Sequence, residues 1–186
     1  TGGIGMLFKK RGVEHIQGRG RVVGLGKVEV ETADGTQTVL ASDIVVASGS
    51  EPAGIPGFEF GPKVWSSTEA LAPTELPKAM VIIGGGVIGM ELGMFYAQVG
   101  TDVTVIEYAD QILPGTDPEL VKVVQRKAKK AGMKIHVSAV AKGWKDAGKG
   151  VDVEVEIKGK AQSFKGDCIL LTTGRKPATK DMGLTE

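Results

Sequence analysis

Three glycines in the stretch VIIGGGVIGME, residues 81–91, are the residues whose type and spacing point most directly to chemistry. They follow an apolar run that predicts a buried strand, and the residues after them are helical in period. A helix N-terminus offers free N–H donors and the positive end of a dipole, which suit phosphate groups. Gly84 permits the tight turn, Gly86 lets the backbone approach a pyrophosphate, and Gly89 lets the helix pack against the strand. The turn therefore predicts a dinucleotide cradle.

An acidic residue follows the glycine turn at the spacing that this kind of cradle requires. Glu107 ends the predicted strand 103–107 and lies 18 residues after Gly89, close to the roughly 20-residue spacing of the dinucleotide fingerprint. A carboxylate at that strand end accepts hydrogen bonds from ribose hydroxyls and repels a 2′-phosphate. The stretch EYADQI, residues 107–112, carries no basic residue. The pattern favours NAD over NADP.

A second carboxylate, Glu91, stands close to the turn and admits two interpretations. In the first turn of a helix, a surface carboxylate is stabilised by the helix dipole without any further role. The same position also lies near a predicted ligand. The residue pattern by itself favours the surface interpretation.

Elsewhere the sequence alternates strands and helices, the arrangement typical of an α/β protein. Asp34 and Gly35 predict a hairpin turn, and Ser66 to Glu69 predict a capping box that opens a short helix. The continuous apolar run at 44–47 predicts a buried parallel strand. The other expected helices are 4–11, 87–99 and Pro118 to Gly132, and the other expected strands are 28–31, 80–83, 103–107, 133–137, a hairpin over 151–164, and 169–173.

Two parts of the chain follow the same order of elements. VEVE, a turn, a strand and IVVASG come before Pro52, whereas VDVEVE, a turn, a strand and ILLTTG come before Pro177. Each of these prolines lies three residues after a glycine, Gly49 or Gly174. Short strands look alike by chance, so chance similarity is one explanation. Two related nucleotide-binding units in tandem are the other.

Composition narrows the class of protein. The 186 residues are 41% hydrophobic and 24% charged with a net charge of +1, an ordinary globular balance that predicts neither a nucleic-acid surface nor a membrane span. The single cysteine, Cys168, lies in an apolar run and is expected to be a buried thiol. His15 and His136 are expected to be ordinary loop and strand residues, with no metal site. We expect a reducing compartment, the cytoplasm or the mitochondrial matrix.

Several motifs together indicate a family. VIIGGGVIGMELG followed by VTVIE, with TGGIGMLFKK, GSEP, SSTEAL and TTGRKPAT, resembles the middle segment of dihydrolipoyl dehydrogenases, which are flavoprotein disulfide reductases. The resemblance covers essentially the whole chain. It implies an α/β fold with a Rossmann-like three-layer NAD-binding domain, an antiparallel meander and part of a second, FAD-binding domain. The implied boundaries are 1–55 for the partial FAD-binding domain, 56–173 for the NAD-binding domain and 174–186 for the return toward the FAD-binding domain.

The resemblance also implies roles for individual residues. Glu91 would lie near the nicotinamide, which reverses the surface interpretation, and Glu107 would hold the ribose. Ala141 would contact the adenine, and Gly174 would contact the nicotinamide end. The implied NAD-binding residues are Gly84, Gly85, Gly86, Val87, Ile88, Gly89, Glu91, Glu107, Ala141 and Gly174, and the implied FAD-binding residues are Gly20, Ser48, Gly49 and Ser50.

The catalytic parts of such enzymes do not occur in this sequence. Missing are the redox cysteine pair, the first FAD glycine turn, the later Gly-Asp motif, and the dimerisation domain with its His-Glu pair. We therefore expect no catalytic residue in this segment and no activity of the segment by itself.

The resemblance implies that the parent enzyme oxidises dihydrolipoamide through a disulfide and FAD and reduces NAD. The implied partners are a lipoyl-bearing acyltransferase of a 2-oxoacid dehydrogenase complex and a second copy of the full-length chain. No nucleic-acid or membrane partner is expected. The alternatives are another reductase of the same build, of the mercuric reductase or transhydrogenase type, and a non-catalytic NAD-binding module. The acid at Glu107 disfavours glutathione reductase.

Overall fold

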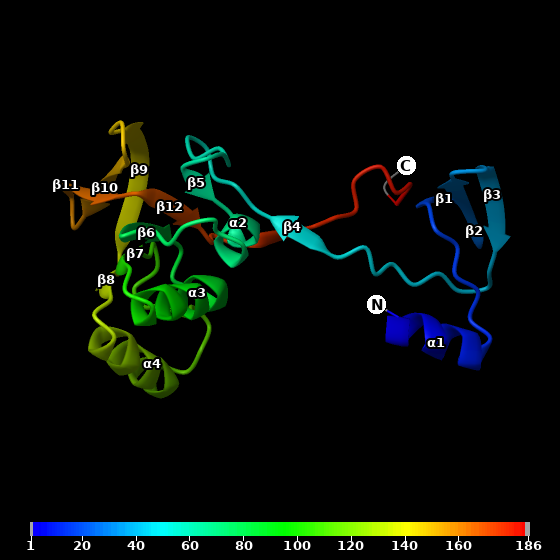
Figure 1. The fold of residues 1–186 in the computed structure, drawn as a ribbon, viewed down its shortest axis with the longest axis horizontal. Coiled ribbons are helices and arrows are strands. Elements are labelled where there is room, and N and C mark those ends of the chain that lie inside the picture. Colours follow the sequence, from blue (N-terminus) through cyan, green and yellow to red (C-terminus); the bar gives the residue numbers. More distant parts are fainter. Residues whose placement is uncertain (1, 185–186) are drawn as a thin grey trace. The chain divides into compact units, whose positions relative to one another are not determined.

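The computed structural model describes residues 2–184, which form two compact units (Figure 1). The first unit comprises the residues up to Ser50 together with those from Pro177 onward, and the second runs from Glu51 to Lys176. Strands β4 (Ser50–Pro52) and β13 (Arg175–Pro177) pair with each other where the chain passes from one unit to the other and back.

In the first unit, the described residues form helix α1 and a three-stranded antiparallel sheet. Helix α1 (Gly2–Arg11) is followed by Gly12, whose φ of 66° suits glycine. Strands β1 (Arg19–Gly24), β2 (Lys27–Thr32) and β3 (Gly35–Leu40) follow one another in the sheet. The turn predicted at Asp34 and Gly35 joins β2 to β3, as expected. Near the other end of the chain, the carbonyl of Met182 accepts a hydrogen bond of 2.9 Å from the Val22 N–H.

The buried parallel strand predicted at 44–47 is wrong. This segment belongs to none of the sheets formed by residues 2–184, and Val45 is 88% exposed. A continuous apolar run shows a tendency toward burial, but a parallel strand also needs hydrogen-bonded neighbours from distant parts of the chain. No strand within residues 2–184 forms such hydrogen bonds with residues 44–47.

The second unit is built on a five-stranded parallel sheet in the order β5-β12-β6-β7-β8. Its strands are β5 (Val64–Trp65), β6 (Ala79–Ile83), β7 (Asp102–Ile106), β8 (Lys134–His136) and β12 (Cys168–Leu171). Helix α3 (Val87–Gln98) connects β6 to β7, and helix α4 (Pro118–Lys130) connects β7 to β8. Both helices lie where the sequence predicts them.

Helices cover one face of this sheet, and an antiparallel meander covers the other (Figure 1). The meander consists of β9 (Ala139–Asp146), β10 (Val151–Ile157) and β11 (Lys160–Gly166). Successive strand residues point to opposite faces, so Ile82 packs toward the helices whereas Val81 and Ile83 pack toward the meander. The three layers bury a core on each side of the sheet. The mixed α/β fold predicted from the sequence is confirmed.

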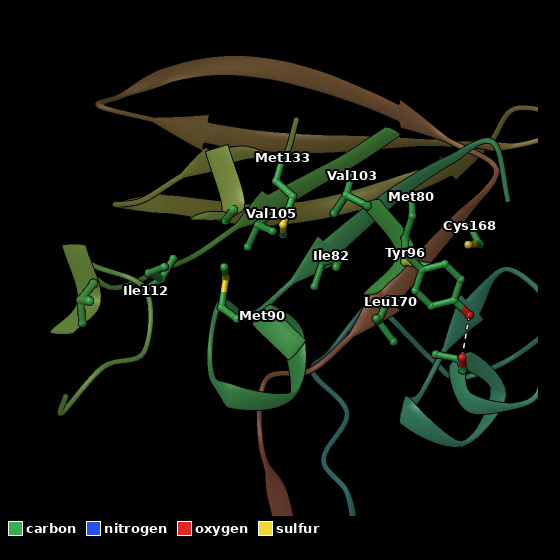
Figure 2. Close-up of a cluster of buried hydrophobic side chains, with 13 residues drawn as sticks. Met80, Ile82, Met90, Tyr96, Val103, Val105, Ile112, Met133, Cys168 and Leu170 are labelled. Carbon is green, nitrogen blue, oxygen red and sulfur yellow. Dashed lines mark hydrogen bonds between the residues drawn. The ribbon is translucent and has the colours of Figure 1, made fainter. Parts of the chain in front are cut away.

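The core on the helical face includes a buried tyrosine with a satisfied hydroxyl (Figure 2). Tyr96 in α3 donates a hydrogen bond of 2.6 Å to the carbonyl of Ala70 in helix α2 (Ser67–Leu71). The predicted capping box opens α2: the Ser66 hydroxyl accepts from the Thr68 N–H, and the Ser66 N–H donates to the Glu69 carboxylate. Across residues 2–184, no helix combines the length and the apolar character needed to cross a membrane.

Candidate functional site

The three glycines of the motif play different parts in the turn between β6 and α3. Gly84 has a φ of 105°, and a Cβ there would lie 2.6 Å from the Thr172 carbonyl oxygen. A Cβ at Gly89 would lie 2.0 Å from the Gly84 carbonyl oxygen. At Gly86, a Cβ would meet no atom within 4 Å. Packing therefore requires the first and third glycines, whereas the middle glycine borders open space.

The remaining glycine of the stretch, Gly85, is buried within the turn. A Cβ there would lie 3.0 Å from Ile112 and 3.2 Å from a carboxylate oxygen of Glu107. Its N–H donates a hydrogen bond of 2.5 Å to that oxygen, Oε2. The turn is thus attached directly to the acid that the sequence singled out.

Glu107 lies immediately after β7 with its side chain largely buried. Its second carboxylate oxygen, Oε1, accepts a hydrogen bond of 2.7 Å from the N–H of Ala109. Each carboxylate oxygen has two lone pairs, so both can accept a further hydrogen bond from a ligand hydroxyl.

A cavity of about 600 Å³ opens at the carboxyl ends of the central strands. Strand β6 has its sequence successor β7 on one side and the last strand of the sheet, β12, on the other. Ligands of open α/β sheets bind where the strand order reverses in this way. The lining residues are Ile55, Ile83, Gly84, Gly86, Val87, Ile88, Ile106, Glu107, Tyr108, Pro114, Ala139, Val140, Ala141, Thr172, Thr173 and Gly174.

The cavity brings together most of the residues expected to hold NAD. Gly84, Gly86, Val87, Ile88, Glu107, Ala141 and Gly174 line it. Gly85 and Gly89 do not line the cavity; Gly85 packs against Glu107, and Gly89 packs against Gly84. Glu91 does not line the cavity: it is exposed on α3, and as the fifth residue of that helix it lies in the second turn, so the placement in the first turn is wrong.

The residues expected to contact FAD belong to the first unit. Gly20 lies in β1, where a Cβ would make ordinary van der Waals contact with Val28. Ser48, Gly49 and Ser50 are exposed, and Gly49 has a φ of 81°. The Gly49 carbonyl accepts a hydrogen bond of 3.1 Å from the N–H of Ala178.

Sequence reasoning missed several residues that line the cavity. Tyr108 could have been found, because it directly follows Glu107. Thr172 and Thr173 precede Gly174 at the end of β12, a position that the strand prediction covered without singling them out. No sequence signal marks Ile55, Pro114 or Val140, which the fold alone brings to the cavity.

The remaining reactive side chains are held in structural positions. Burial, with a smaller effect of the nearby Asp167 charge, raises the pKa of the Cys168 thiol to about 12. Burial, reinforced by Lys134, lowers the pKa of His136, whose ring packs 4.7 Å from that of Phe164. Within residues 2–184, no three His, Cys, Asp or Glu side chains group together in a way that could hold a metal ion.

A three-layer unit with a cavity at the carboxyl ends of a parallel sheet is the architecture of α/β nucleotide-binding proteins. Comparison with protein families gives a match over residues 1–186 to the family described as pyridine nucleotide-disulphide oxidoreductase. The chain belongs to this family, which uses FAD and NAD as cofactors. The resemblance inferred from the sequence is confirmed.

Individual relatives agree with the family. The chain is 39% identical to a dihydrolipoyl dehydrogenase of Bacillus subtilis over its whole length, and 43% identical to dihydrolipoyl dehydrogenase 3 of Pseudomonas putida over 99% of it. Among solved structures, LpdA from Mycobacterium tuberculosis matches 98% of the chain with a TM-score of 0.87 and 27% identity. The chain spans about 40% of the length of these relatives and 41% of that solved chain.

Proposed function

We propose that this chain is the NAD-binding portion of a dihydrolipoyl dehydrogenase-like enzyme, which oxidises dihydrolipoamide through a disulfide and FAD and reduces NAD. The observation that carries the proposal is the cavity with open space at Gly86 on one wall and the buried Glu107 on another. In this proposal residues 56–173 bind NAD, and residues 1–55 and 174–186 belong to an FAD-binding domain.

The residues of the cavity fit a dinucleotide. Helix α3 has no side-chain cap at Gly86 and no acidic residue in its first turn, so its N-terminal N–H groups are available to the pyrophosphate. The open space at Gly86 admits the phosphates, and the Glu107 oxygens accept from the ribose hydroxyls. The small apolar Ala141 leaves room for the adenine, and Gly174 lines the cavity where the nicotinamide end would lie. Glu91, which is exposed on α3 outside the cavity lining, would contact the nicotinamide from that helix. When bound, NAD supplies a nicotinamide ring that accepts a hydride.

The remaining assignments concern the parent protein. Gly20, Ser48, Gly49 and Ser50 would contact FAD in the first unit. A lipoyl-bearing acyltransferase of a 2-oxoacid dehydrogenase complex would be the partner, and the full-length chain would form a homodimer in the cytoplasm or the mitochondrial matrix. The relatives named dihydrolipoyl dehydrogenase support the context of a 2-oxoacid dehydrogenase complex.

Isothermal titration of the 186-residue chain with NAD and NADP tests the proposal. We expect NAD to bind at least about tenfold more tightly than NADP, because Glu107 repels the 2′-phosphate. Glu107→Gln should narrow this ratio, whereas Glu119→Gln, which removes an exposed carboxylate from α4, should leave it unchanged.

Equal binding of the two nucleotides by the wild-type chain, or no binding of either, would overturn the proposal. Because the sequence holds one cysteine, we also expect no turnover of dihydrolipoamide by this chain. Measurable turnover would contradict the assignment of the chain as a binding portion.

A further inference from the structure

One peptide plane of the glycine turn is held at both ends by side chains from two other strand ends. The carbonyl oxygen of Gly84 accepts a hydrogen bond of 2.8 Å from the Thr172 hydroxyl, which follows β12. The N–H of Gly85, in the same peptide, donates to the Glu107 carboxylate, which follows β7. The Gly84–Gly85 peptide therefore links the ends of β6, β7 and β12.

The next peptide plane is fixed as well. The Gly85 carbonyl accepts a hydrogen bond of 2.8 Å from the N–H of Leu113. In a trans peptide the C=O and N–H bonds point in opposite directions, so the Gly86 N–H points away from Leu113. Glycine peptides rotate more freely than others, so a glycine turn gains order only from such external partners. Together these bonds set the orientation of the backbone that enters α3.

We propose that Thr172 is a positioning residue for dinucleotide binding: its hydroxyl holds the Gly84–Gly85 peptide in the orientation that prepares the turn for a pyrophosphate. The inference rests on the proposed function. Preorganised groups bind more tightly because their ordering is complete before the ligand arrives. Thr172 also lies close to α3, since its hydroxyl oxygen is 2.7 Å from where a Cβ at Gly89 would be. A variant must therefore keep the shape of the side chain while removing the donor.

Thr172→Val meets this requirement, whereas Thr172→Ser keeps the hydroxyl and serves as the conservative variant. Thr101→Val is the matched control, because the buried Thr101 hydroxyl also donates to a carbonyl, that of Pro77 at 2.7 Å, and does not line the cavity. Calorimetry would measure the Kd of ADP-ribose, which contains the pyrophosphate. A ligand-observed NMR titration would measure the Kd of adenosine, which lacks it. The amide signals of Gly85 and Gly86 would report the turn in the free protein.

We expect Thr172→Val to weaken ADP-ribose binding about three- to tenfold, the effect of one hydrogen bond, and to leave adenosine binding unchanged. The Gly85 and Gly86 signals should shift in Thr172→Val and return in Thr172→Ser together with the affinity. Thr101→Val should lower the midpoint of urea unfolding about as much as Thr172→Val does, and it should bind ADP-ribose with the wild-type affinity.

If Thr172 has only a structural role, Thr172→Val should weaken the binding of ADP-ribose and adenosine equally, or should weaken neither. Either result, with a wild-type chain that still binds NAD, would overturn the inference. A wild-type chain that binds neither NAD nor ADP-ribose would instead overturn the proposed function. If Thr172→Val does not fold, Thr172→Ala removes the same donor with a smaller side chain and carries the same expectations.

Discussion

Two glycines of the same turn should respond to alanine in opposite ways. Gly86 has a φ of −71°, which any residue adopts, and the space around it is open. Gly89 is helical, but an alanine methyl there would overlap the backbone oxygen of Gly84 at 2.0 Å. Gly86→Ala should therefore impair binding without loss of stability, and Gly89→Ala should impair stability first.

The magnitudes follow from these surroundings. Alanine at the N-cap position of Gly86 costs roughly 0.5–1 kcal/mol relative to glycine, and the reduced entropy of the unfolded chain offsets roughly 0.4–1 kcal/mol. The free energy of unfolding should thus stay within about 1 kcal/mol of wild type. The methyl group would occupy space needed by the pyrophosphate, at a cost of about 1–3 kcal/mol, or roughly five- to 150-fold in Kd. At Gly89 the methyl group would overlap a backbone atom, which cannot rotate away. The free energy of unfolding of Gly89→Ala should therefore fall by about 3 kcal/mol.

Urea unfolding followed by tryptophan fluorescence measures the stability of the relevant unit, since both tryptophans, Trp65 and Trp144, lie in the second unit. Calorimetry with NAD measures binding. Gly61→Ala, in another open position of the same unit, is the control and should change neither quantity. The reasoning would be refuted if Gly86→Ala lost as much stability as Gly89→Ala, or if it bound NAD as tightly as the wild-type chain.

Two further expectations concern titration and reactivity. Burial lowers the pKa of His136 below its usual value of 6.5, so its contribution to stability is complete above pH 6.5 and is lost as the pH falls through the lower folded-state pKa. The urea midpoint should fall over this range, and His136→Gln should flatten the fall; an unchanged slope would contradict the assignment. Because burial raises the pKa of Cys168 to about 12, its reaction with a disulfide reagent at pH 8 should be slower by roughly a hundredfold or more in the folded chain than in 8 M urea. Rapid labelling of the folded chain would show that the thiol is accessible.

The sequence by itself determined the local elements around the site. The apolar run before the glycines is strand β6, and the helical period after them is α3. The Asp117–Pro118 pair begins α4, where the Asp117 carboxylate accepts a hydrogen bond of 2.8 Å from the Glu119 N–H. These features depend on partners a few residues away, so composition and spacing suffice to predict them.

The tertiary structure decided what surrounds the turn. Thr172 bonds to Gly84 across 88 positions of sequence, and Ala141 reaches the same cavity from the meander. The apolar run at 44–47 shows that local sequence is not sufficient. Its residues suit a buried strand, but no strand among residues 2–184 pairs with it. Parallel strands gather their carboxyl ends from distant parts of the chain. Which side chains meet there depends on strand order, and local sequence does not specify that order.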